Sequence, residues 1–241
     1  MSSTMTAIHN NSLRNGRRSL QITIHQALKK IWLAARGIRP TACVPLVSPN
    51  PGDQAWVISP AGLGTEPLVY SLGLSENVSF DLGIIQQYGA KVHGFDPTIE
   101  SQRFIAKNRI PAGFHYHPLA VAGHDGKLDL YERMGKGGRK KGACFLRASC
   151  KKVSTLIQEL GHSRLDILKV DVEGSEYSIL EDVCLKGIHA SQIAVEFHHR
   201  FEEVGLSATF RSHKMLLRHG YQLAYISDWA EEFLYIKGGE C

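Results

Sequence analysis

The sequence predicts an α/β fold: a doubly wound, mostly parallel sheet with an antiparallel hairpin at one edge and an N-terminal helical arm. Between residues 53 and 241, short apolar strands alternate with helices of about ten residues, which is typical of a parallel sheet covered on both faces. The last two strands, 221–227 and 232–237, are joined by a short link, which indicates the hairpin. With 241 residues, 43% of them hydrophobic, the chain suffices for one such domain.

The first 52 residues form a basic arm in this prediction, and residues 53–241 form the globular domain. The arm contains seven Lys or Arg residues and no Asp or Glu. Residues 19–37 are expected to form an amphipathic helix that packs on the domain or closes its mouth. The apolar stripe of this helix consists of Leu20, Ile24, Leu28, Ile31 and Trp32.

Two other interpretations of the arm stay open. An acid-free arm with Ser and Arg residues is also typical of an organelle transit peptide, or of a helix that contacts an anionic membrane surface. Lys29 and Lys30 interrupt any apolar run of the length that a membrane span requires. The five cysteines are scattered without a C-x-x-C pair, which favours a reducing compartment and hence a cytoplasmic location. The domain itself is slightly acidic, so no specific nucleic-acid binding is predicted.

The first half of the domain follows a linker rich in Pro and Gly at 45–64. Its apolar strands are expected at 67–73, 91–96 and 114–121. Its helices are expected at 79–89 and 100–108. Asp125-Gly126 indicates a turn into a small extra strand, and the Gly- and Lys-rich residues 133–149 are expected to form a loop. Part of that loop, 135–142, is a candidate lid over an anionic acceptor, although solvation alone would also explain its charge.

The second half of the domain repeats the alternation. Helices are expected at 153–161, 175–184 and 208–220. Strands are expected at 165–170 and 192–197, before the two strands of the closing hairpin. No internal repeat is visible.

Polar residues collect where the predicted strands end. In open α/β sheets the ligand lies outside the carboxyl ends of the strands, near the point where strand order reverses. The residues predicted at this rim are Gly73, Asp96, Asp171, Glu173, Glu196, His198 and His199. Buried or half-buried carboxylates are costly unless they are paired or used, so we expect this rim to be the functional site.

Asp96 lies 23 residues after Gly73, near the spacing at which an acid on the second strand accepts the hydroxyls of an adenosine ribose. Gly73 would let the backbone approach the ligand closely. The G-x-G-x-x-G fingerprint is absent, which disfavours a dinucleotide because a pyrophosphate needs those backbone N–H groups. A cofactor with a ribose but no phosphate, such as S-adenosylmethionine, is therefore expected.

Three motifs make the domain resemble the FkbM family of methyltransferases over roughly 69–237. They are VHGFDPTIES at the second strand, HPLAVAGHDGKLDLY through the third, and LDILKVDVEGSEYSIL followed by IAVEFHH. The block KVDVEGSEY is the specific part. The resemblance implies the Rossmann-like class I methyltransferase sheet, S-adenosylmethionine as methyl donor, and a hydroxyl of a sugar or natural product as acceptor.

The first loop departs from the family pattern, which looks like D-x-G-A-N-x-G. Here Ser71 replaces the acid that would face the amino group of the cofactor, and only Gly73 of the glycines remains. Either Glu76 or Asp81 takes over that role, or affinity for the cofactor is reduced. The cofactor site expected from the resemblance consists of Gly73, Ser75, Asn77, Asp96, Pro97, Ala120 and Asp171.

His198 is the expected catalytic base, because it lies two residues from Glu196 and so on the same strand face. Glu196 would orient it or bind acceptor hydroxyls, and Asp171 and Glu173 would face the acceptor. Alternatively, Asp171 and Glu173 cap the helix that follows. A third alternative is that Asp171, Glu196 and His198 hold a divalent metal, but the sequence does not determine coordination geometry and no metal is predicted.

The expected function is O-methylation of a small-molecule or glycan acceptor by an S-adenosylmethionine-dependent methyltransferase. The alternative from another class is a catalytically silent methyltransferase fold that serves as a binding module. The altered first loop favours the silent module, whereas the acids and imidazoles at four strand ends favour the enzyme. The sequence determines neither the acceptor nor the oligomeric state.

Overall fold

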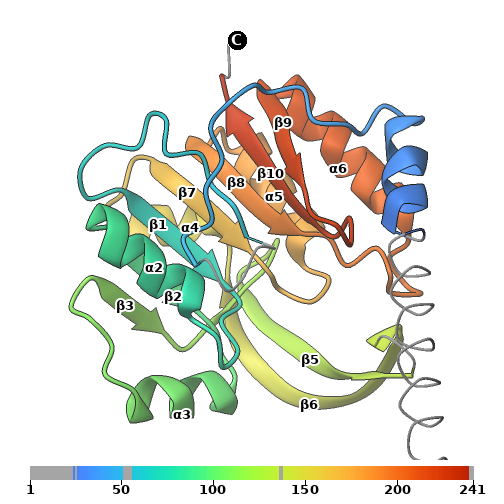
Figure 1. Ribbon diagram of the computed structural model, residues 1–241. Coiled ribbons are helices and arrows are strands. Elements are labelled where there is room, and N and C mark those ends of the chain that lie inside the picture. Colours follow the sequence, from blue (N-terminus) through green and yellow to red (C-terminus); the bar gives the residue numbers. More distant parts are fainter. Residues whose placement is uncertain (1–23, 25, 51–55, 136–137, 239–241) are drawn as a thin grey trace, which may run out of the picture.

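The computed structural model describes residues 24, 26–50, 56–135 and 138–238, and its centre is a seven-stranded sheet (Figure 1). The strand order is β3-β2-β1-β7-β8-β10-β9. The strands are β1 (Leu68–Leu72), β2 (Lys91–Phe95), β3 (Phe114–His117), β7 (Leu165–Val170), β8 (Ala190–Glu196), β9 (Tyr221–Ile226) and β10 (Glu232–Lys237). Every neighbouring pair is parallel except those made by β10, which runs antiparallel to both β8 and β9. The predicted fold class is confirmed.

Helices cover both faces of this sheet. They are α2 (Ser79–Tyr88), α3 (Ile99–Lys107), α4 (Val153–Glu159), α5 (Glu176–Leu185) and α6 (Leu206–Arg218). One core joins α4, α5 and α6 to one face, and a second core joins α2 to the other. β7 is buried along its whole length, as expected of a central parallel strand, and strand order reverses between β1 and β7. The carboxyl ends of β1 and β7 therefore flank the place where a ligand is expected.

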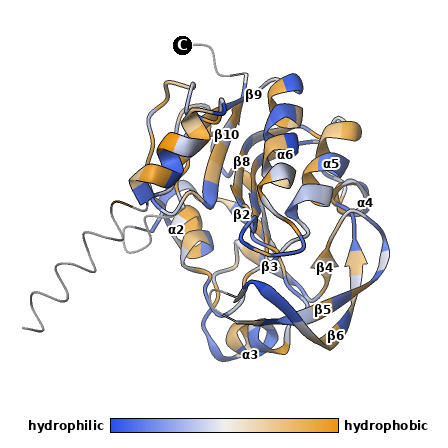
Figure 2. Cartoon of the chain, turned by 90° about the vertical axis from the view of Figure 1, so that its right-hand side faces the viewer, coloured by the Kyte–Doolittle hydropathy of each residue, from blue (hydrophilic) through white to orange (hydrophobic). Residues whose placement is uncertain are grey.

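A second, three-stranded sheet in the order β4-β6-β5 lies below the main sheet (Figure 1, Figure 2). Its strands are β4 (Ala120–Val121), β5 (Gly126–Met134) and β6 (Lys140–Lys151). The prediction of a loop at 133–149 is wrong, because most of that segment is β6, paired antiparallel with β5. Gly and Lys are depleted in strands generally, but this ribbon leaves much of its surface in solvent, where their side chains carry little penalty.

The predicted third strand at 114–121 is divided between the two sheets. β3 pairs with β2 in the main sheet, whereas β4 pairs with β6 in the small one. Pro118 lies at the break, and it has no N–H to donate to a ladder. The break turns Ala120 toward the space between the two sheets.

The end of the arm packs on the domain, as expected. Residues 26–34 are helical, Leu33 is fully buried, and the Trp32 ring lies 5.7 Å from that of Phe210 on α6. Lys29 and Lys30 bind the turn between β9 and β10, through Glu231 and Asp228 respectively.

Only part of the apolar stripe takes part in this packing. Ile24, Leu28 and Ile31 are exposed, and Leu20 lies outside the described residues. Within the described part of the chain, no helix is long and apolar enough to cross a membrane. Residues after the helix continue over the α2 face of the sheet, where Trp56 and Ile58 are buried.

Candidate active site

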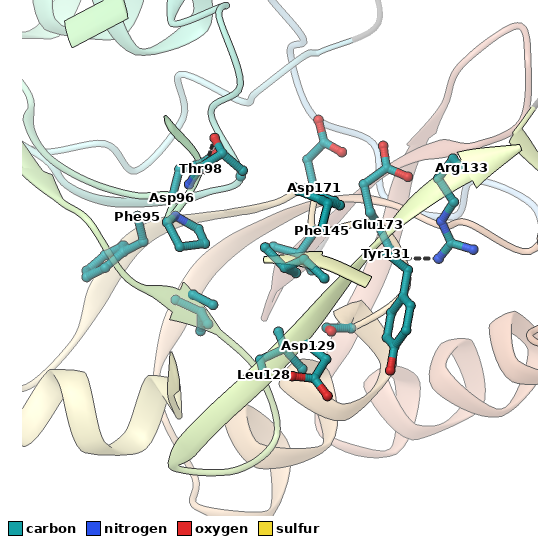
Figure 3. Close-up of a pocket in the computed structure, with 17 residues that line it drawn as sticks. Phe95, Asp96, Thr98, Leu128, Asp129, Tyr131, Arg133, Phe145, Asp171 and Glu173 are labelled. Atoms are coloured by element: carbon teal, nitrogen blue, oxygen red, sulfur yellow. Dashed lines mark hydrogen bonds between the residues drawn. The ribbon is translucent and has the colours of Figure 1, made fainter. Parts of the chain in front are cut away.

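A pocket opens where the carboxyl ends of β1, β2 and β7 face the β5–β6 ribbon (Figure 3). One side, formed by β4 and the strand ends of the main sheet, consists of Gly73, Phe95, Asp96, Pro97, Thr98, Ala120, Val121, Asp171, Val172, Glu173 and Ser175. Its ribbon side consists of Leu128, Asp129, Leu130, Tyr131, Arg133 and Phe145. Five of the seven residues predicted to bind the cofactor line this pocket. Apolar walls with a few carboxylates are typical of a site for a small organic ligand.

Gly73 is required by a close approach between two strand ends. Its φ is +79°, and a Cβ built on it would lie 1.6 Å from the backbone oxygen of Asp171. The sequence suggested that a glycine here admits the ligand. The structure shows that it first of all admits the end of β7, so that β1 and β7 can meet under the pocket.

Asp96 is 5% exposed, and its carboxylate holds two loops together. Its Oδ2 accepts hydrogen bonds from the backbone N–H groups of Leu74 and Ser75, and its Oδ1 accepts them from the N–H and hydroxyl of Thr98. A carboxylate offers about four acceptor positions, and four are in use here. A ribose hydroxyl can bind this carboxylate only by replacing one of these donors, and Thr98 is the donor residue that lines the pocket.

The other residues of the first loop lie outside the pocket. Ser75 has a positive φ of 50° and donates its N–H to Asp96, while Asn77 accepts a hydrogen bond from the N–H of Ser79 at the start of α2. Both are thereby engaged in loop structure. The side chains predicted to replace the missing acid, Glu76 and Asp81, do not line the pocket either.

Asp81 is instead buried below the loop, 1% exposed, in the core beside Lys169. Burial raises the pKa of Asp81 to about 6, even though the positive charge of Lys169 opposes this shift. Lys169 itself lies over the ring of Trp56 and 3.8 Å from Asp171. An acid is thus present near position 71, but it is buried in the neighbouring helix, close enough to Lys169 for the lysine charge to act on it.

The ribbon side of the pocket was not predicted. Arg133 ties it to the rim: its side chain donates to the backbone oxygen of Glu173, pairs with Glu203, and lies over the ring of Phe201. The small extra strand expected after Asp125-Gly126 is β5, but no signal in the sequence showed that it faces the pocket. The Gly- and Lys-rich run after it concealed its partner strand, β6.

His198 is surrounded by carboxylates, and we call His198 with Asp171, Glu173, Glu176 and Glu196 the rim cluster. The imidazole is 0% exposed. Its Nε2 lies 3.5 Å from both Glu173 and Glu196 and 3.9 Å from Asp171, and its Nδ1 lies 3.3 Å from Glu176. None of these contacts has hydrogen-bond alignment. The prediction that these strand ends converge on one point is therefore correct for four of the residues.

The environment of His198 does not suit the predicted role of catalytic base. Burial alone would lower its pKa, but the carboxylates of Glu173 and Glu176 outweigh burial and raise the pKa to about 10. The ring is thus protonated at neutral pH and has no lone pair to accept a proton. It also does not line the pocket, whereas Asp171 and Glu173 do.

Glu176 was missed by the sequence analysis. Its two oxygens accept hydrogen bonds from the backbone N–H groups of Gly174 and His198, so it ties the turn before α5 to the end of β8. Among the described residues, no side chain caps the start of α5, so the capping considered for Asp171 and Glu173 is not observed. Glu196 is held by Arg200, 3.0 Å away, and burial raises the pKa of Glu196 to about 7 with help from the charge of Asp171. Asp171 and Glu173 are left facing the pocket (Figure 3).

His199 does not join this cluster. It is buried, its Nδ1 lies 3.4 Å from the hydroxyl of Thr209 on α6, and burial lowers its pKa to about 4.

A second group of histidines lies on β2, β3 and the loop before β7. These edge histidines are His93, His115, His117 and His162. His93 stacks between neighbours, with its Nδ1 2.9 Å from Nε2 of His117 and its ring 4.9 Å from that of His115. No role was predicted for this group, and none of its members lines the pocket.

Comparison with known proteins agrees with this geometry. The family model described as "Methyltransferase FkbM domain" matches residues 73–223, which is more than half of the chain. The chain is 26% identical over 133 residues to the probable methyltransferase-like protein 24 of Homo sapiens, and equally to that of Rattus norvegicus. The match covers 54% of this chain but 32% of either relative, so the chain spans about a third of their length.

Solved structures give a more distant similarity. The precorrin-6y C5,15-methyltransferase of Geobacter metallireducens has a TM-score of 0.44 at 10% identity, over 73% of this chain and 84% of that one. The fibrillarin pre-rRNA processing protein of Methanococcus jannaschii has a TM-score of 0.44 at 9% identity, over 73% and 68%. These scores are low, so the fold assignment rests on the observed strand order.

The resemblance first drawn from KVDVEGSEY is confirmed by the family match, which spans the first loop, the pocket and the rim cluster. The chain therefore belongs to the FkbM methyltransferase family, whose methyl donor is S-adenosylmethionine.

Proposed function

We propose that this chain transfers the methyl group of S-adenosylmethionine to a hydroxyl oxygen of a sugar or natural-product acceptor. The observation that carries the proposal is the pair of carboxylates at the end of β7, Asp171 and Glu173, which line an otherwise largely apolar pocket. Carboxylates are acceptors only, so they suit a ligand that presents hydroxyl or ammonium donors.

The residues of the pocket fit the cofactor in kind. Phe95, Val121 and Leu128 offer an apolar surface for a planar base, and Thr98 presents a hydroxyl next to it. Asp171, whose backbone lies against Gly73 and whose side chain lines the pocket, would receive the amino group that the missing acid at position 71 no longer binds. When bound, the cofactor supplies an electrophilic methyl group on a sulfonium.

The acceptor would lie between the rim and the ribbon. Glu173 would accept the hydrogen bond of its hydroxyl and so orient the oxygen toward the methyl group, which is the main requirement of an in-line transfer. As the new C–O bond forms the C–S bond breaks, and the hydroxyl proton is released toward the carboxylates of the wall. Asp129 and Tyr131, on the opposite side of the pocket, would bind the rest of the acceptor.

The second candidate is a silent binding module, and one observation favours it. Asp96 already uses its carboxylate on Leu74, Ser75 and Thr98, so the ribose must compete with internal hydrogen bonds.

Calorimetric titration separates the two candidates. We expect S-adenosylmethionine and S-adenosylhomocysteine to bind the purified chain and NAD not to bind. A screen of sugars and polyols with a labelled methyl donor should then give a methoxy product, identified by NMR. A folded chain that binds neither ligand would refute the enzyme and leave the silent module, and a methylated nitrogen or carboxylate would refute the hydroxyl acceptor.

A further inference from the structure

We infer that the rim cluster is a binding site for one divalent cation of the Mg²⁺ or Mn²⁺ type, held by Asp171, Glu196 and His198. In the proposed methyl transfer, this cation would coordinate and polarise the acceptor hydroxyl, and in that respect the inference rests on the proposed function. The site itself is argued from geometry, charge and the chemistry of the donors.

The three side chains lie close to the separation that a shared ion requires, and small side-chain movements would complete the site. One ligand atom from each can be chosen so that all lie within 4.8 Å of one another. At a metal–ligand distance of about 2.1 Å, ligands on one octahedral ion are about 3.0 Å apart when adjacent and about 4.2 Å apart when opposite. The observed distances from Nε2 of His198, 3.5 Å to Glu196 and 3.9 Å to Asp171, fall between these limits.

The imidazole of His198 is an independent indication of a ligand. It is 0% exposed, and in the described part of the chain neither of its nitrogens has a hydrogen-bond partner. A buried ring nitrogen without a hydrogen-bond partner is costly, and in folded proteins such a group is usually satisfied by a bound ion or an ordered water. Three carboxylates lie within 4 Å of Nε2, so an ion placed among them would be within reach of this nitrogen.

The balance of charge at the cluster also favours a cation. Asp171, Glu173 and Glu196 all lie within 4 Å of Nε2, whereas Glu176 is satisfied by two backbone N–H groups. Arg200 divides itself between Glu196 and Glu231, at 3.0 and 2.8 Å, and Lys169 stays 3.8 Å from Asp171. With the cation bound, His198 would be the neutral imidazole that a metal ligand must be, and its proton would be released to solvent. Arg200 and Lys169 alone then leave the centre of the cluster negative.

The donor set selects the kind of metal. Two carboxylates and one imidazole, with no thiolate, suit a hard or borderline divalent ion that keeps open positions for water or substrate oxygen. Asp171 lies on the pocket wall, so these open positions would face the acceptor.

The test uses the full chain, stripped with a chelator, with neither cofactor nor acceptor present. Mn²⁺ is titrated and the free ion is followed by electron paramagnetic resonance, with Mg²⁺ as competitor. We expect one Mn²⁺ per chain, and a loss of affinity of about tenfold or more in Asp171→Asn and in Glu196→Gln. The matched control is Asp129→Asn, a pocket carboxylate on the ribbon, whose affinity should equal that of the wild type.

A second measurement needs no variant and therefore no assumption about folding. Pulsed resonance of the Mn²⁺-loaded wild type should show coupling to an imidazole ¹⁴N, as expected if His198 is a ligand. Absence of Mn²⁺ binding at millimolar concentration, or absence of the nitrogen coupling, would overturn the inference, as would equal binding by wild type and Asp171→Asn, the mark of an adventitious ion only.

Failure of the metal site and failure of the proposed function give different results. If the chain binds S-adenosylmethionine and methylates an acceptor in the presence of chelator but takes up no Mn²⁺, only the metal site is refuted. If the chain binds Mn²⁺ at the rim cluster but no S-adenosylmethionine, the metal site is supported and the proposed methyl transfer is refuted.

Discussion

The rim cluster and the edge histidines present the same side chain in opposite states. His198 sits among carboxylates and its pKa is raised to about 10, although burial opposes that shift. His93 sits among other imidazoles beside the ring of Tyr70, and burial together with the charges of its histidine neighbours lowers its pKa to about 4. Burial acts in the same direction on both, so the neighbouring charges decide the outcome.

The difference shows which histidines belong to function. The buried positive charge of His198, beside an open pocket, is stabilised by the four carboxylates around it. Groups whose pKa is perturbed in this way cluster at functional sites. A neutral stack on an edge strand needs no such arrangement. It is explained by ring packing, as in the stacking of His117 on Phe95 at 4.6 Å. The predictions below test whether this contrast is real, beginning with the largest expected effect.

Removal of the rim imidazole should be the most damaging change. We expect His198→Ala to lower the free energy of unfolding by about 3–5 kcal/mol, because it leaves buried carboxylates facing one another without a counter-charge. Denaturation in urea, with a chelator present so that no cation replaces the ring, measures this. If the free energy of unfolding of the variant is within about 0.5 kcal/mol of the wild-type value, the contrast between the two groups of histidines is wrong, because His198 then contributes no more to stability than an exposed histidine.

The edge histidines should make stability fall in acid. His93 has a lower pKa in the folded state than in the unfolded state, so its contribution is fully present above about pH 6.5 and is lost as the pH falls toward 4. In His93→Gln, we expect about one proton fewer to be taken up on unfolding across that range. Unfolding free energies measured at several pH values give this number from their slope. An unchanged slope would mean that His93 is protonated in the folded state.

The hydrogen bond between Tyr70 and His162 should contribute a smaller amount. The Tyr70 hydroxyl lies 2.7 Å from Nδ1 of His162, and burial raises the pKa of Tyr70 well above its usual value. Tyr70→Phe keeps the ring and should lower the free energy of unfolding by about 1 kcal/mol. Urea denaturation measures the loss, and Tyr131→Phe, in the ribbon, is the matched control. No loss would indicate that solvent replaces the phenol.

The smallest effect is expected at His115. This side chain is exposed and stacks on His93 from the solvent side. His115→Ala should change the free energy of unfolding by no more than about 0.5 kcal/mol, again by urea denaturation. A larger loss would mean that the stack, and not only its buried members, stabilises this edge of the sheet.

Local sequence patterns predicted much of the fold. The apolar run ending at Asp171 predicted β7, and the helices and strands after it follow the predicted alternation. The extra strand expected after Asp125-Gly126 is β5, but its partner β6 was missed because the Gly and Lys content of residues 133–149 points to a loop. Strand composition depends on which face meets solvent, and a sequence does not show that face.

The candidate site, like the fold, was predicted only in part. The carboxyl ends of the strands placed Asp96, Asp171 and Glu173 at one rim, because that follows from topology alone. Topology did not show that Asp96 accepts hydrogen bonds from its own neighbouring loops, or that Glu176 binds the backbone N–H groups of Gly174 and His198.

By itself, then, the sequence determined the order of strands and helices, the family, and which side chains reach the carboxyl ends of the strands. The tertiary structure alone decided the charge of His198, the burial of Asp81 and the second wall of the pocket. The physical reason is the distance along the chain between the residues that determine each property. Periodicity and strand ends are set by neighbours along the chain, whereas burial, proton affinity and pocket shape depend on groups brought within a few ångströms from distant parts of it.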